Sequence, residues 1–171
     1  MSNLQHQTIT NLPGKAVVPK TSPRFASGPL ELNVIFTDPR GTRAALNFAQ
    51  SYAHELGARI HLRAAIAVPF QLPLEEPPVP VSFLQETFRK LVAELERDTF
   101  DPTVHLCLCR DRVWALSQAL KPNSLIVIGG PRRWWPTAES RMAQALRSKG
   151  HRVIIVDSRA RSGSAQPVFA R

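Results

Sequence analysis

Short runs of apolar residues alternate with longer amphipathic segments along most of this chain. Five apolar or alternating runs predict β-strands near residues 32–36, 59–68, 104–109, 125–128 and 153–156. Between these runs, apolar residues recur every three or four positions, which predicts helices near 45–56, 82–95, 111–120 and 140–149. This alternation predicts an α/β fold with an open, doubly wound, parallel five-stranded sheet flanked by helices, of the Rossmann-like type.

The segment 124–157 shows this pattern most clearly. Its two strands, Leu125–Ile128 and Val153–Val156, are entirely apolar, as expected for strands buried on both faces of a parallel sheet. A strand, helix and strand in this order predict a right-handed parallel crossover. Ligands of such sheets bind beyond the carboxyl ends of the strands, so residues 129–136 are the first place to look for a site.

The two ends of the chain differ from the middle in composition. Residues 1–30 carry four prolines, three basic residues and no acid, which predicts a disordered or loosely attached N-terminal arm. Residues 158–171 form a basic C-terminal tail, also without an acid. Of the formal net charge of +9, only +3 belongs to the expected folded domain, residues 31–157. The basic ends favour contact with nucleic acid or another anionic surface, or they are simply solvated.

Several functional classes are not expected from this sequence. No apolar run approaches the roughly 20 residues of a membrane span, and the first residues lack a signal-peptide pattern, so we expect a cytoplasmic protein with no membrane contact. No Gly-x-Ser-x-Gly motif is present, and we expect no catalytic residues and no enzyme activity.

A metal site is not expected either. Cys107 and Cys109 are the only cysteines, too few for a four-ligand zinc site or a disulfide framework. Together with His61 and His105 they would share one face if their two strands pair, but no C-x-x-C spacing supports metal binding.

Three features together resemble the universal stress protein family. They are Asp38 just after the first strand, LKPNSLIVIGG leading into the fourth strand, and the final helix and strand SRMAQALRSKGHRVIIVD. The resemblance covers about residues 31–157 and implies a fold like that of the adenine nucleotide alpha hydrolases. It also implies a role in stress adaptation and a homodimer formed through the last strand. Asp38 would lie at the adenine and ribose end of the crevice.

The chain departs from the ATP-binding motif of that family, G-x2-G-x9-G-[ST]. Gly129, which Gly130 follows, matches the first glycine, but Arg132 stands at the second. Ser140 matches the last residue, but Glu139 replaces the glycine before it, and the loop is three residues shorter. A Cβ restricts the backbone approach to phosphate, and a carboxylate competes for the helix N-terminus. We therefore expect no cofactor, and ATP binding that is weak at best.

In place of the motif, the loop carries two cations beside two indoles: Arg132, Arg133, Trp134 and Trp135. This combination can hold a small anionic or nucleotide ligand through ion pairing and stacking. Alternatively, the tryptophans fill the crevice and the arginines are solvated.

Three functions remain open from the sequence. The first is a universal stress protein-like binding or regulatory module without tight ATP binding, and it is the function we expect. The second is a nucleotide-responsive stress protein that binds ATP or AMP. The third is a nucleic-acid or anion-binding protein that uses the basic ends and the Arg-Arg-Trp-Trp loop.

Overall fold

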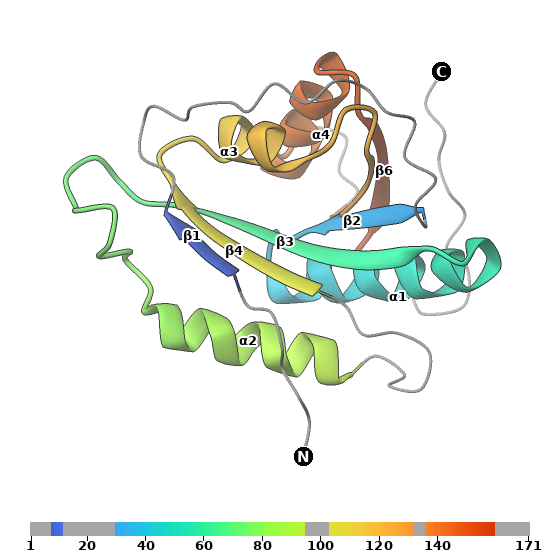
Figure 1. Ribbon diagram of the computed structural model, residues 1–171, viewed down its shortest axis with the longest axis horizontal. Coiled ribbons are helices and arrows are strands. Elements are labelled where there is room, and N and C mark those ends of the chain that lie inside the picture. Colours follow the sequence, from blue (N-terminus) through green and yellow to red (C-terminus); the bar gives the residue numbers. More distant parts are fainter. Residues whose placement is uncertain (1–7, 12–29, 95–102, 132–135, 160–171) are drawn as a thin grey trace.

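The computed structural model describes residues 8–11, 30–94, 103–131 and 136–159. They form a six-stranded parallel sheet in the order β1-β4-β3-β2-β5-β6 (Figure 1). The strands are β1 Thr8–Asn11, β2 Glu31–Ile35, β3 Arg59–Ala67, β4 Thr103–Cys109, β5 Leu125–Gly130 and β6 Arg152–Asp157. The α/β class and the five expected strands are therefore confirmed.

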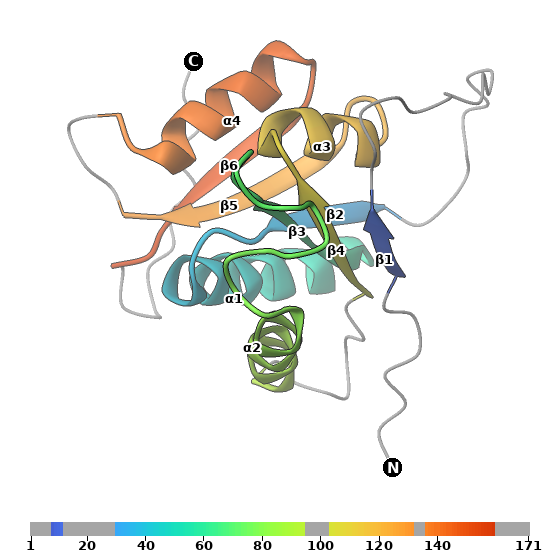
Figure 2. The same cartoon turned by 90° about the vertical axis from the view of Figure 1, so that its left-hand side faces the viewer.

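Two helices cover each face of the sheet (Figure 2). One face packs against α1 Pro39–Leu56 and α2 Val81–Ala93, through an apolar core centred on Leu62, Leu46 and Phe88. The other face packs against α3 Arg112–Ala119 and α4 Ala138–Ser148, around Ile126 and Ile128. From β2 the chain adds strands in one direction along the sheet, and from β5 it adds β6 in the other direction. Because the crossovers are right-handed, the connecting helices of the two halves lie on opposite faces.

Local signals in the sequence account for the ends of α1 and α4. Asp38 caps α1, Pro39 follows at the first helical position, and Gly57 ends the helix with a left-handed φ of 61°. Thr137 caps α4, and Gly150 lies just past its end with φ 88°.

The structure adds one strand that the sequence pattern did not predict. Thr8–Asn11 pairs in parallel with β4, with Thr8 opposite His105 and Asn11 opposite Leu108. The expected N-terminal arm therefore contributes to the sheet. Four residues with a single aliphatic side chain are too short for the alternating pattern to be recognised, and pairing with a complete neighbouring strand stabilises them.

Both edges of the described sheet can now be assigned. β1 lies at one edge and β6, the last strand, at the other. β2 and β5 lie side by side in the middle, and the chain leaves them toward opposite faces (Figure 2). The carboxyl ends of these two strands are thus the switch point at which ligands of such folds bind.

Candidate functional site at the switch point

Asp38 lies directly after β2, where the sequence placed it, but its carboxylate has a local role. Its Oδ1 accepts hydrogen bonds from the backbone N–H groups of Arg40 at 2.8 Å and Gly41 at 3.0 Å. The side chain is otherwise exposed. One carboxylate oxygen therefore stabilises the first turn of α1, and the second is left for solvent or a ligand.

Gly129 lies at the switch point, in contact with the first turn of α1. A Cβ built on Gly129 would lie 1.7 Å from the carbonyl oxygen of Gly41, and one on Gly41 would lie 2.6 Å from the carbonyl oxygen of Gly129. The hydroxyl of Thr37 also donates to that Gly129 carbonyl at 2.8 Å. The glycine thus serves close packing of backbone against backbone, which leaves little space between the ends of β2 and β5.

Gly130 and Ser140 lie on the α4 side of the switch point. A Cβ on Gly130 would lie 2.8 Å from Cγ of Glu139, so the Glu139 side chain packs directly over this glycine. The Ser140 N–H donates to Oγ1 of Thr137 at 3.2 Å, and the Ser140 hydroxyl donates to the Thr137 carbonyl at 2.9 Å. Side chains of the protein itself therefore occupy the N-terminus of α4, where a phosphate would bind.

The remaining predicted site residues, Arg132, Arg133, Trp134 and Trp135, lie outside the described residues. The structure describes Pro131 before them and Pro136 after them, which connect the end of β5 to the cap of α4.

Arg112 is a switch-point residue that the sequence analysis missed. From the first turn of α3, its guanidinium donates to the carbonyl oxygen of Phe36, at the end of β2, at 2.8 Å. Its Nε is buried and has no hydrogen-bond partner among the described residues. The sequence did contain a signal for this residue, because Arg112 begins a short helix directly after a strand. The carboxyl ends of parallel strands lie at a common edge of the sheet, so such a residue is placed near the switch point.

Arg43, near the start of α1, forms an ion pair away from the switch point. Its Nε lies 2.5 Å from Glu94 Oε2 and its guanidinium donates to Oε1 at 2.8 Å, which joins α1 to α2. This hydrogen bond raises the pKa of Arg43 and lowers the pKa of Glu94.

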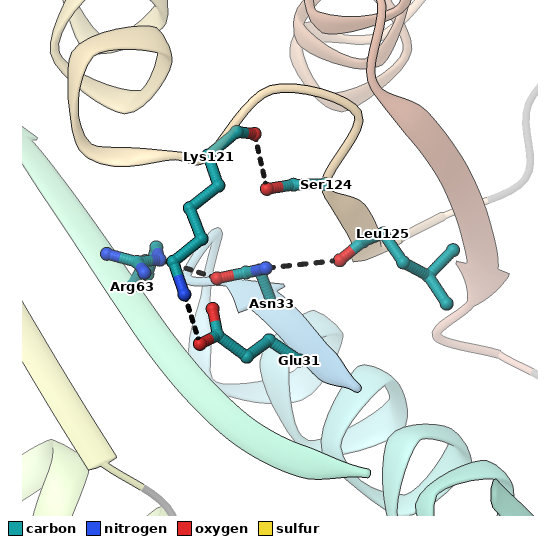
Figure 3. A network of polar contacts seen from close by, with 6 residues as sticks. All are labelled: Glu31, Asn33, Arg63, Lys121, Ser124 and Leu125. Atoms are coloured by element: carbon teal, nitrogen blue, oxygen red, sulfur yellow. Dashed lines mark hydrogen bonds and ion pairs between the residues drawn. The ribbon is translucent and has the colours of Figure 1, made fainter. Parts of the chain in front are cut away.

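A second group of polar residues lies away from the switch point, on the α3 and α4 side of the sheet. Asn33 is 1% exposed; its Oδ1 accepts from Arg63 Nε at 2.6 Å, and its Nδ2 donates to the Leu125 carbonyl at 3.3 Å (Figure 3). Lys121 Nζ lies 2.5 Å from Oε1 of Glu31, and this hydrogen bond lowers the pKa of the Glu31 carboxyl. A buried asparagine inside an otherwise apolar strand was the signal for this network.

Two histidines lie beside Arg63. The pairing of β3 with β4 places the rings of His61 and His105 5.6 Å apart. Burial, followed by the charge of Arg63, lowers the pKa of both imidazoles, and burial also lowers the pKa of Arg63. Within the described part of the chain, no group of three or more His, Cys, Asp or Glu side chains is arranged to hold a metal ion.

No protein-family model matches the chain, and no curated protein matches it. One solved structure with a similar fold is described as a universal stress protein in complex with cAMP. The two chains are 16% identical with a TM-score of 0.48, over 77% of this chain and 99% of the other. Among the described helices, none is both long and apolar enough to cross a membrane.

Proposed function

We propose that this chain is a universal stress protein-like module that acts by binding in stress adaptation, without catalysis and without tight ATP binding. The observation that carries the proposal is the packing of Glu139 over Gly130 beside the capped N-terminus of α4. A phosphate at this position would meet a carboxylate and would compete with Thr137 for a backbone donor.

The contact between Gly41 and Gly129 supports the same proposal from the other side of the switch point. A nucleotide that entered between the ends of β2 and β5 would have to separate two backbones that are already in contact. Such a rearrangement lowers the apparent affinity of any ligand that needs it.

Isothermal titration calorimetry with ATP and magnesium tests this proposal. We expect a dissociation constant weaker than roughly 100 micromolar, which corresponds to about −5.5 kcal/mol or less. Glu139→Gly is the informative variant, because it removes the side chain over Gly130, and we expect it to bind ATP more tightly than the unmutated chain. Gln144→Gly, at an exposed position further along α4, is the matched control for glycine in this helix.

A low-micromolar, stoichiometric isotherm for the unmutated chain would contradict the proposal. It would favour the nucleotide-responsive alternative, in which Nε of Arg112, which has no partner among the described residues, and the exposed carboxylate of Asp38 contribute to binding. Cyclic AMP belongs in the same titration series, because the similar solved structure is described as a complex with it.

We further propose that β6 pairs with its counterpart in a homodimer. The N–H groups of Arg152 and Ser158 donate to Ser124 and Gly130, so even-numbered residues of this strand direct their N–H groups toward β5. The N–H of Ile155 then points to the open edge, and Ile155→Pro removes a donor from that edge only.

Analytical ultracentrifugation checks the dimer. We expect the unmutated chain to be dimeric at tens of micromolar and Ile155→Pro to dissociate at least about tenfold more readily. Ile154→Pro serves as the contrast, because it removes a bond to β5 and destabilises the fold itself. A monomer for the unmutated chain would contradict this proposal.

A further inference from the structure

The face of the sheet under α3 and α4 is apolar over only part of its area. Over β5 it presents residues such as Ile126 and Ile128 to the two helices. Over β2, β3 and β4 the same face presents Asn33, Arg63 and His105, which lie level with Ile126 and Ile128 along the strands. His61 joins them, because residues two apart along a strand share a face. The polar group thus lies beside the apolar part of this face, on β2, β3 and β4, and before the carboxyl ends of the strands that form the switch point.

The positive charge of this polar group exceeds its negative charge. Among the described residues, the direct partner of the Arg63 guanidinium is the neutral amide of Asn33, at 2.6 Å. Glu31, the acid that acts on Arg63 through space, is hydrogen-bonded to Lys121 at 2.5 Å. The Nη end of Arg63 extends away from Asn33 (Figure 3). A half-buried cation without its own counter-ion is costly, and an anionic partner removes that cost.

The hydrogen-bonding capacity of His61 is unused as well. Both of its ring nitrogens are buried, and neither has a partner among the described residues. A neutral imidazole carries one N–H, and a charged one carries two, so at least one donor is unpaired. Buried polar groups without a protein partner commonly pair with water or an ion.

We propose that Arg63, His61 and His105 bind a small phosphate-type oxyanion on this face of the sheet, with Lys121 as a further cation. The arginine fork and the histidine N–H groups are donors, and an oxyanion offers only acceptors, so the two sets match. This site is separate from the switch point and does not depend on the function proposed for it.

Binding at this site is coupled to proton uptake. The charged groups around the two imidazoles are Glu31, Arg59, Arg63 and Lys121, with the Cys107 thiol next along β4. Burial and Arg63 favour the neutral imidazoles in the free protein, whereas a bound anion favours their charged forms. For an oxyanion of constant charge, such as sulfate, affinity therefore rises as the pH falls toward the lowered pKa values of the free imidazoles.

Titration of the full chain with inorganic phosphate, followed by NMR of the histidine side chains, tests the proposal. We expect the resonances of His61 and His105 to shift saturably, with a dissociation constant of about 1 millimolar or tighter. We expect little change at His54, which is exposed on α1, or at His151, which lies between α4 and β6. Sulfate and acetate distinguish tetrahedral from planar oxyanions, and chloride at equal ionic strength controls for screening.

Two variants locate the site, and one serves as a control. Arg63→Gln removes the central cation and is expected to weaken phosphate binding by about tenfold or more. Arg141→Gln removes an equal charge at an exposed position of α4, outside the site, and is expected to change binding less than about twofold. Asn33→Asp places a carboxylate beside Arg63 without changing side-chain size, and the competing charge is expected to weaken phosphate binding as strongly as Arg63→Gln.

Two results would overturn the proposal. One is the absence of any saturable shift of His61 or His105 at phosphate concentrations up to roughly 50 millimolar, far above the expected constant. The other is an equal loss of affinity in Arg63→Gln and Arg141→Gln, which would identify general attraction to a basic surface. If Arg63→Gln does not fold, Asn33→Asp provides the test. Phosphate binding that is unchanged beside the new carboxylate would show that phosphate does not bind at Arg63.

Discussion

The switch point and the polar group on β2, β3 and β4 differ in how fully their polar groups are paired. At the switch point, Thr37 and Thr137 donate to or accept from neighbouring backbone groups, and Gly41 contacts Gly129. Apart from Nε of Arg112, no buried side-chain nitrogen or oxygen described there is without a partner. In this region, where the fold predicts a ligand, most of the described buried polar groups thus have hydrogen-bond partners within the protein.

On β3 and β4 the situation is reversed. His61 has two buried nitrogens without partners among the described residues, and Arg63 has a neutral amide in place of a carboxylate. The comparison teaches that topology indicates where related folds bind ligands. Unpaired donors and charges indicate where this particular chain has binding capacity left.

The largest expected effect tests whether the switch point is as tightly closed as its distances imply. Gly129→Ala would place Cβ 1.7 Å from the Gly41 carbonyl oxygen, so the backbone of α1 or β5 must move. We expect the free energy of unfolding to fall by about 3 kcal/mol or more, measured by urea denaturation.

Gly130→Ala is the matched comparison for that measurement. Its Cβ would meet Cγ of the Glu139 side chain, which can rotate away more easily than backbone. A loss of about 1–2 kcal/mol is expected. Equal, small losses for the two variants would show that the contact between Gly41 and Gly129 is loose and that the crevice can open.

The second-largest expected effect tests how strongly Asn33 stabilises the Arg63 side chain. Asn33→Ala removes the acceptor of Arg63 and the donor to the Leu125 carbonyl, and it leaves both groups unpaired in a buried place. We expect the free energy of unfolding to fall by about 2–3 kcal/mol. Asn47→Ala, at an exposed position of α1, should change it by less than about 0.5 kcal/mol. Similar values for both variants would mean that Arg63 finds another partner.

The third and smallest effect is a dependence of stability on pH. The folded protein lowers the pKa of His61, His105 and His151, chiefly by burial, so the unfolded chain takes up protons first as the pH falls. The free energy of unfolding is therefore highest above about pH 6.5 and decreases below it, by up to about 1.4 kcal/mol for each unit of pKa lowering.

Urea denaturation between about pH 7.5 and 5.5 measures this dependence. The double variant His61→Leu/His105→Leu should lose most of the slope and retain only the part that belongs to His151. Glu31 and Glu94, whose pKa values are lowered, contribute only below about pH 4.5 and do not disturb this window. A flat profile for the unmutated chain would show that the imidazoles are hydrated in the folded state.

The sequence alone determined the main architecture, because each element carries a local signal. The fully apolar runs of β5 and β6 indicated buried parallel strands, and the apolar periodicity of residues 45–56 indicated α1. The sequence did not predict that α1 begins as early as Pro39. Periodicity and capping depend on neighbours along the chain, so they are visible without the fold. The same local rules placed Asp38 and Gly129 at the switch point.

Only the tertiary structure decided what those residues do there. Gly129 could equally have served a phosphate, and the approach of Gly41 from 88 residues earlier in the chain assigns it to packing. Strand β1 exists through pairing with β4, and the polar group forms because β2, β3 and β4 align Asn33, Arg63 and His105 on one face. These features depend on contacts between distant segments, and a short sequence window contains no record of which segments will meet.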